Sequence, residues 1–279
     1  MPLEVKEYKG KFLSRFRTLN RAKLYAEIRS PEDAIEAFAL AEKLGAKPFV
    51  LGAGSNVFFR RSDISAFVMK NAVEKKIEPL GGDRFLVSSS VMMIDLLKFM
   101  RDESRAAPYY LASAPCEVGG AIAMNAGTGP KEGKAVFDFI ESVKFVRGGK
   151  VLELPAAEIA HSHRSTELSS NAFALSAVFS FPKTELSSDP VKDRLEWAAK
   201  NQDLSVPNCG SLCNKYDARL MRFARFLFAP LPAGMSQKKL NWAYNKAESP
   251  ACLRAFISTL TLLHKIFRKE LKYEIKMID

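Results

Sequence analysis

The chain has 279 residues, of which 47% are hydrophobic and 26% are charged, and its formal net charge is +11. This composition excludes a wholly disordered chain, and the length allows two or three compact units. The N-terminus "MPLEVKEYKGKFLSRF" has no apolar h-region, and no run of about eighteen apolar residues follows it. We therefore expect a cytoplasmic protein without membrane insertion.

The basic residues are dispersed in short pairs, such as Arg60–Arg61 and Lys238–Lys239. A positive surplus attracts nucleic acid, acidic lipid or phosphorylated small molecules. No aromatic residues are interleaved with these pairs in a recognisable RNA-binding pattern. A solvated basic surface is therefore favoured over a nucleic-acid partner.

The chain has four irregularly spaced cysteines and only three histidines. This pattern predicts neither a disulfide framework nor a metal site. The cysteines are Cys116, Cys209, Cys213 and Cys252.

The first predicted helix begins at Ser30-Pro31. Serine is a preferred N-cap, proline suits the first helical position, and the acids that follow favour the positive end of the helix dipole. Apolar residues recur on one face as far as Gly45, which predicts the end of the helix. The segment "KPFVLG" (47–52) then predicts a buried strand that leads into a glycine turn.

From about Ala72 to Pro182 the pattern predicts short strands in "FLVSSSV", "SVKFV", "KVLELP" and "FALSAVFSF", interrupted by one helix within residues 92–105. The polar segment 183–193 predicts a boundary, after which the chain is more helical. A helix starting at Ser249-Pro250 is expected to carry an apolar stripe. The stripe consists of Leu253, Phe256, Ile257, Leu260, Leu263 and Phe267. The closing "LKYEIKMI" (271–278) alternates as one strand.

Two glycine-rich turns are the candidate sites for chemistry. In "LGAGSN" (51–56), successive backbone amides in a turn after a strand can form an anion nest. The turn lacks the third glycine of a dinucleotide fingerprint, so a plain tight turn is the alternative. In "SAPCEVGGAIAMNAG" (113–127), the alternative to a ligand site is a close crossing of backbones.

Together the two turns resemble the UDP-N-acetylenolpyruvoylglucosamine reductase (MurB) family, whose motifs run roughly "LGxGSN" and then "IPGxVGGAxxMNAG". The resemblance continues in order through "HRST", "PNCGS", "LNWAYNKAESPA" and "LKYEIKMI". Six short motifs in one order are hard to obtain by chance, and they extend over nearly the whole chain.

The resemblance implies an α+β fold of the FAD-binding PCMH/VAO type, with two flavin subdomains (1–72 and 73–185) and a C-terminal α+β substrate domain (186–279). FAD would be bound non-covalently, with NADPH as electron donor, in a monomer whose substrate is a UDP-sugar. Cys116 would lie near the flavin without being bonded to it. The implied FAD-binding residues are Gly52, Ala53, Gly54, Ser55, Asn56, Val57, Pro115, Val118, Gly119, Gly120, Asn125 and Gly127.

The family reaction implies three catalytic roles. Arg164 would clamp the substrate carboxylate, Ser211 would deliver a proton to C2, and Glu274 would help Arg164 stabilise the enolate-like intermediate. The resemblance thus implies the reduction of UDP-N-acetylglucosamine enolpyruvate to UDP-N-acetylmuramate, a step in peptidoglycan precursor synthesis. Each residue has a plain alternative, respectively a solvated loop arginine, a turn serine and a surface ion-pair partner.

Several positions depart from the family pattern. Ser113 and Cys116 stand where glycine is usual, and "VSSSV" (87–91) replaces a glycine-rich stretch. In the substrate half, Lys215-Tyr216 replaces asparagine and proline, and Gly234 replaces a substrate-contacting glutamine. Lys215 could supply a compensating charge to the substrate. The alternative hypothesis is accordingly a diverged flavin-binding homologue with another substrate or no catalysis.

Overall fold

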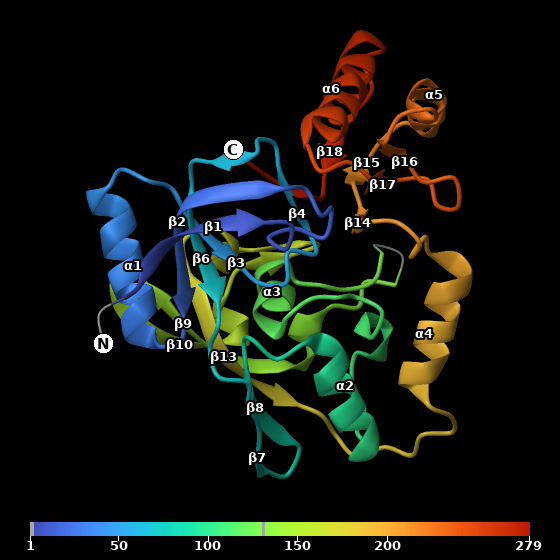
Figure 1. The fold of residues 1–279 in the computed structure, drawn as a ribbon. Coiled ribbons are helices and arrows are strands. Elements are labelled where there is room, and N and C mark those ends of the chain that lie inside the picture. The colour runs from blue at the N-terminus through green and yellow to red at the C-terminus, as the bar shows by residue number, and fades with distance from the viewer. Residues whose placement is uncertain (1–2, 130–131) are drawn as a thin grey trace. The chain divides into compact units, whose positions relative to one another are not determined.

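The computed structural model describes residues 3–129 and 132–279. The chain forms two compact units, each assembled from separate stretches of sequence. Unit 1 comprises the chain up to residue 6 together with residues 25–52 and 67–197, and unit 2 comprises residues 7–24, 53–66 and 198–279. Both units combine helices and strands, as predicted (Figure 1).

The main sheet of unit 1 is antiparallel, in the order β10-β9-β13-β8-β7. Four of its strands (β8, β9, β10 and β13) confirm the predicted short strands, whereas β7, at one edge of the sheet, was not predicted and has no buried residue. The strands are β7 (Ile77–Gly81), β8 (Arg84–Ser88), β9 (Ile140–Arg147), β10 (Lys150–Pro155) and β13 (Phe173–Ser180).

A parallel ladder in unit 1 joins the end of β2 (Asn20–Ile28) to β6 (Phe67–Asn71), and β6 to β3 (Pro48–Leu51). Helix α1 (Pro31–Lys43) packs against β3, β6 and β9. Ser30 caps this helix as predicted, since its side chain accepts from the Asp33 amide while the Asp33 carboxylate accepts from the Ser30 amide.

Helix α2 (Met93–Asp102) confirms the helix predicted within 92–105, and its apolar face is buried in the core of unit 1. The short helix α3 (Val118–Ala123) lies in the same core. The small elements of this unit are η1 (Tyr109–Leu111), η2 (Val136–Phe139), η3 (Ala156–Glu158), β11 (His161–Ser162), β12 (Ser165–Thr166) and η4 (Glu167–Ser169).

Unit 2 is built on short ladders and two packed helices, α5 (Ala218–Phe228) and α6 (Ala251–Ile266). One ladder has the order β14-β17-β16, and the pairs β15-β18 and β4-β19 are separate. The strands are β4 (Val57–Phe59), β5 (Asp63–Ile64), β14 (Asn208–Ser211), β15 (Cys213–Lys215), β16 (Ala233–Met235), β17 (Trp242–Asn245), β18 (Lys272–Tyr273) and β19 (Lys276–Ile278).

Strands β1 (Val5–Gly10) and β2 and helix α4 (Pro190–Asn201) contribute residues to both units. Each unit has its own apolar core. Unit 2 buries the side chains of Phe16, Phe58, Leu253, Phe256 and Leu260.

Two details of the C-terminal segment were wrong in the sequence prediction. Phe267 follows the last turn of α6 and is exposed, so the core stripe ends before it. The closing strand is two strands, because the chain changes partner between β18, which pairs with β15, and β19, which pairs with β4. The amides of Glu274 and Ile275 both donate to the Leu212 carbonyl at this break.

Candidate functional site

The first glycine turn follows β3. Gly54 has φ +65°, and a Cβ there would lie 2.3 Å from the Leu13 carbonyl oxygen, so a close backbone crossing requires glycine. Within the described residues, the amides of Ala53, Gly54 and Ser55 donate no hydrogen bond. Three small-residue amides that lack a protein acceptor suit an anion such as a diphosphate.

The second turn leads into α3 in unit 1, where two of its glycines serve close packing. A Cβ on Gly119 would lie 3.0 Å from Ser89 Cβ, and one on Gly127 would lie 2.1 Å from the Lys134 carbonyl oxygen. A Cβ on Gly120 would meet no atom within 4 Å. Gly120 is therefore the glycine of this motif that leaves room for a ligand.

The first amides of α3 already have partners. Val118 N donates to Val91 O and Gly119 N to Ser89 O, both at 2.8 Å. The Val118 side chain is buried in the core of unit 1, whereas Pro115 is exposed in the preceding loop. The first amides of α3 therefore already donate to carbonyls of the 89–91 loop. A ligand would contact α3 at Gly120 instead.

Two buried hydroxyls in unit 1 have no hydrogen-bond partner within the structure: Ser90 Oγ and Tyr110 Oη. Burial raises the pKa of the Tyr110 phenol, which also lies close enough to Asp138 and Arg164 to feel their charges. A buried polar atom without a partner is costly unless water or a ligand satisfies it. Sequence reasoning missed both residues, although "VSSSV" marked the first as a departure from the family pattern.

A buried charged network fixes the two motifs of unit 1 to each other. Lys70 Nζ lies 2.7 Å from Glu117 Oε1 and donates to the Gly52 carbonyl at 3.0 Å, while Asn71 Nδ2 donates to Glu117 Oε2 at 2.9 Å. Ser89 Oγ donates in turn to Asn71 Oδ1 at 3.3 Å. The network thereby links the Gly52 turn, β6, the 89–91 loop and the residue that precedes α3. Sequence reasoning missed it, because its members are far apart along the chain.

Arg164 lies in the turn of the β11-β12 hairpin with φ +58°, an uncommon backbone conformation for a residue with a side chain. The end of α3 holds this hairpin on both sides of the turn. Asn125 Nδ2 donates to the Ser162 carbonyl and Thr166 Oγ1 donates to the Ala123 carbonyl, both at 3.0 Å. Asn125, predicted as a cofactor residue, therefore also positions the strand next to Arg164.

In unit 2, one side-chain and one backbone hydrogen bond bring Asn56, the Ser211–Leu212 segment and Glu274 together. Asn56 Nδ2 donates to the Glu274 carbonyl at 3.1 Å, and Glu274 N donates to Leu212 O, next to Ser211, at 2.9 Å. Val57 begins β4 and pairs with Lys276 of β19. The predicted proton donor and the predicted carboxylate thus lie on adjacent backbone segments.

Ser211 ends β14 at a bulge, where Gly210 has φ +74°. A bulge turns a side chain away from the regular alternation of a strand, and bulges are frequent beside active sites. Within the described residues, no hydrogen bond engages the Ser211 hydroxyl. Nearby, burial raises the pKa of the Cys213 thiol to about 12, and the Glu274 carboxylate adds to the shift.

Two departures from the family pattern have local explanations. Lys215 is exposed on β15 and pairs with Glu270 Oε1 at 3.1 Å, as a surface lysine would. Ser113 accepts a hydrogen bond from Arg194 Nε of α4 at 2.9 Å, which glycine could not do.

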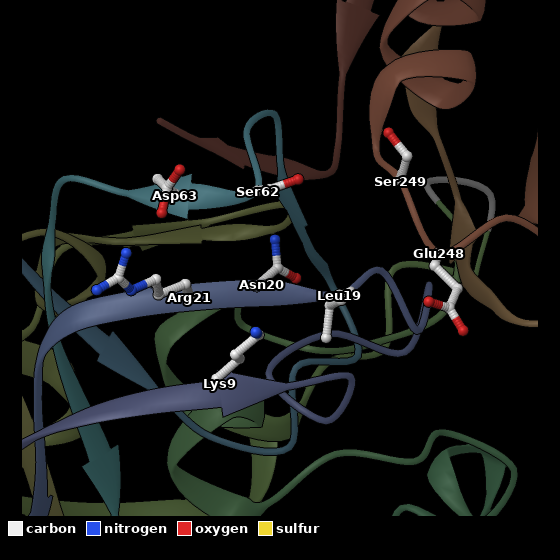
Figure 2. A pocket seen from close by; sticks show the side chains of 8 residues that line it. All are labelled: Lys9, Leu19, Asn20, Arg21, Ser62, Asp63, Glu248 and Ser249. Carbon is white, nitrogen blue, oxygen red and sulfur yellow. The ribbon is translucent and has the colours of Figure 1, made fainter.

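A cavity of about 320 Å³ in unit 2 is lined by the eight side chains labelled in Figure 2. None of the predicted site residues is among them. Arg21 makes two hydrogen bonds with Glu7, and Asn20 Nδ2 donates to Arg61 O, so these polar groups are already engaged. The cavity is lined by side chains of both charges.

No group of three or more His, Cys, Asp or Glu side chains in residues 3–129 and 132–279 could hold a metal ion. No helix within those ranges has the length and apolar character needed to cross a bilayer.

Comparison with known proteins places this geometry in context. A model of the FAD binding domain matches residues 22–154. The chain is similar to UDP-N-acetylenolpyruvoylglucosamine reductases. The reductase of Chlamydia felis is 26% identical, and the match covers 73% of this chain and 69% of the relative. The reductase of Myxococcus xanthus is 27% identical, and the match covers 85% of this chain and 78% of the relative. The chain belongs to this reductase family. Other relatives in it are matched over 59–60% of their length.

The solved structure of the family member from Thermus caldophilus matches the whole of both chains, with a TM-score of 0.77 at 18% identity. The predicted fold is therefore confirmed as the FAD-binding PCMH/VAO type in an α+β protein. Family membership and an FAD-binding domain are thereby established, whereas the individual roles of the predicted site residues stay predictions.

Proposed function

We propose that the protein is a cytoplasmic, FAD-dependent reductase that uses NADPH to convert UDP-N-acetylglucosamine enolpyruvate to UDP-N-acetylmuramate for peptidoglycan synthesis. The observation that carries the proposal is the anchoring of the Arg164 hairpin by the end of α3. The segment that bears the flavin motif thus also positions the predicted clamp for the substrate carboxylate. A monomer and the domain division at residues 72 and 185 are part of the same proposal.

The residues present fit FAD. In unit 2, the Ala53–Ser55 amides without acceptors would supply donors for a diphosphate. In unit 1, the open face of Gly120 would supply room for the cofactor, and the unsatisfied Ser90 hydroxyl would supply a polar contact. Bound FAD would supply the hydride chemistry. The chain's own residues would bind and protonate the substrate.

Arg164 would bind the substrate carboxylate through two parallel hydrogen bonds, a geometry that suits a guanidinium. Ser211 would deliver a proton to C2, since its hydroxyl is not engaged elsewhere in the described chain. Glu274 would support the charge that develops at the carboxylate.

A second candidate is a flavin-binding homologue with a different substrate. It is favoured by Gly234, which is buried in β16 where the family places a substrate glutamine. A Cβ there would lie 3.3 Å from Phe228 Cβ, so a side chain at this position would require Phe228 to shift. Contacts to the UDP-sugar at this position would have to come from other residues.

Separate half-reactions distinguish the two candidates. Ser211→Ala should leave flavin reduction by NADPH nearly unchanged and slow reoxidation by the enolpyruvyl sugar nucleotide roughly 100- to 10,000-fold. Arg164→Ala should also weaken substrate binding. A wild-type protein that is reduced by NADPH but is never reoxidised by this substrate would exclude the proposed reaction and leave the second candidate.

A further inference from the structure

Helix α5 of unit 2 has two apolar faces. Met221, Ala224 and Phe228 are buried, whereas Phe223 and Phe226 on the opposite side are 48% and 75% exposed. At 100° per residue these two phenylalanines lie about 60° apart on the helix surface. An outward face of large apolar side chains indicates a binding surface, because isolated folding does not require it.

A second group of exposed apolar residues lies at the end of α6, at Leu262 and Ile266, and at Phe267 directly after it. The two helices pack against each other, since the Asp217 amide at the start of α5 donates to His264 Nε2 of α6 at 3.0 Å and Phe228 at the end of α5 contacts Phe256 of α6. Figure 1 shows these two helices side by side in unit 2. We call the exposed residues Phe223, Phe226, Leu227, Leu262, Ile266 and Phe267 the α5-α6 surface.

The charge around the α5-α6 surface has one sign. Residues 218–247 contain no Asp or Glu, and all of their charged side chains are basic. Lys265, Arg268 and Lys269 add positive charge at the end of α6. The acids that flank these segments in sequence, Asp217 and Glu270, are engaged locally, because Asp217 caps α5 and Glu270 pairs with Lys215.

We infer that the α5-α6 surface docks on an anionic lipid bilayer, with its phenylalanines in the interface and its arginines at the headgroups. Helix α5 consists only of Ala, Arg, Leu, Met and Phe, so it offers no uncharged hydrogen-bonding group for reading a protein or a base. An aromatic and aliphatic face bordered by arginine is typical of interfacial helices. A second copy would bring arginine against arginine, which disfavours self-association. The inference is independent of the reaction proposed above.

Cosedimentation with large unilamellar vesicles tests the inference. The wild type should bind phosphatidylcholine vesicles containing phosphatidylglycerol but not pure phosphatidylcholine, and the binding should weaken as salt rises. Neutralisation in R219Q/R222Q should lower the partition coefficient about 25-fold, at about fivefold per charge. F223S/F226S should lower it at least about tenfold, because the apolar contact is lost. L80S/V151S, which alters exposed apolar residues of unit 1, is the matched control and should bind like the wild type.

Three results would overturn the inference. The wild type could fail to sediment with anionic vesicles at low salt. F223S/F226S could bind anionic vesicles like the wild type, which would show that the protein binds them through its net charge and not through the α5-α6 surface. Light scattering could show a wild-type dimer that F223S/F226S dissolves, with no vesicle binding, which would assign the surface to a second copy. Retained circular dichroism in both double variants separates all three results from misfolding.

Discussion

Removing the Lys70 ammonium should destabilise unit 1, because it leaves the buried Glu117 carboxylate with only the Asn71 amide. The side chains of Glu117 and Lys70 are 9% and 27% exposed, and their charged atoms are 2.7 Å apart. At an effective dielectric constant near 20 the gross attraction is about 6 kcal/mol, which is largely offset by the cost of desolvating two ions. Loss of one partner from a buried pair typically lowers the free energy of unfolding by about 3–5 kcal/mol. Because Lys70 is partly exposed, we expect a loss of about 2–4 kcal/mol when its ammonium is removed.

The assay is urea unfolding of Lys70→Met, Glu117→Gln and the double variant. The chain has two tryptophans, with Trp197 in unit 1 and Trp242 in unit 2. Fluorescence in a Trp242→Phe background therefore follows unit 1. The double variant should lose about 1–3 kcal/mol less unfolding free energy than the two single variants lose in sum, because no buried charge remains in it. The matched control is Lys76→Met, which removes an exposed Lys–Glu pair also 2.7 Å long and should match the wild type. Additivity of the two single variants within about 0.5 kcal/mol would refute the reasoning.

Three further predictions concern the cofactor and the thiols. Gly120→Val should give folded protein that lacks flavin absorbance, whereas Gly129→Val, with equally open space outside the motif, should retain it; equal flavin in both would remove Gly120 from the cofactor site. Acid precipitation should leave the flavin in the supernatant, since Cys116 is expected to be unbonded, and colour in the pellet would contradict this. Burial raises the pKa of Cys209 to about 11, so its neutral thiol stabilises the fold below pH about 8.5, the ordinary thiol pKa. That contribution should be lost as the pH rises towards 11, and Cys209→Ala should show a flatter alkaline decline in unfolding free energy than the wild type.

Local patterns were sufficient to predict the elements whose ends are set by neighbouring residues. Ser30 and Pro31 fixed the start of α1 through capping, which depends on atoms within one helical turn. The closing segment could not be predicted in the same way. It alternates as a single strand, but the two halves pair with β15 and β4, and nothing within the segment specifies a change of partner.

The same distinction applies to the candidate site. The sequence indicated a close approach to the backbone at Gly54, Gly119 and Gly127. In the structure the group that approaches is protein, namely a neighbouring backbone or side chain. Glu117 offered the one available clue to the buried network, as a charged residue inside a motif of small ones. Its partner Lys70 is 47 residues away, and only the folded chain identifies it.

The departures in the substrate half are coupled to one another through packing. Gly234 lies against Phe228, the last residue of α5, and Phe228 also packs edge-on against Phe256 of α6 at 5.1 Å between ring centroids. A glutamine at position 234 would therefore need Phe228 to move, and Phe228 is held by the core of unit 2. The segment "ARFLFAP" (224–230) supplies both this obstructing phenylalanine and the exposed Phe226. The obstruction at position 234 and the exposed apolar face thus arise from one stretch of helix, so Gly234→Gln alone should not produce the glutamine contact that the family resemblance implies.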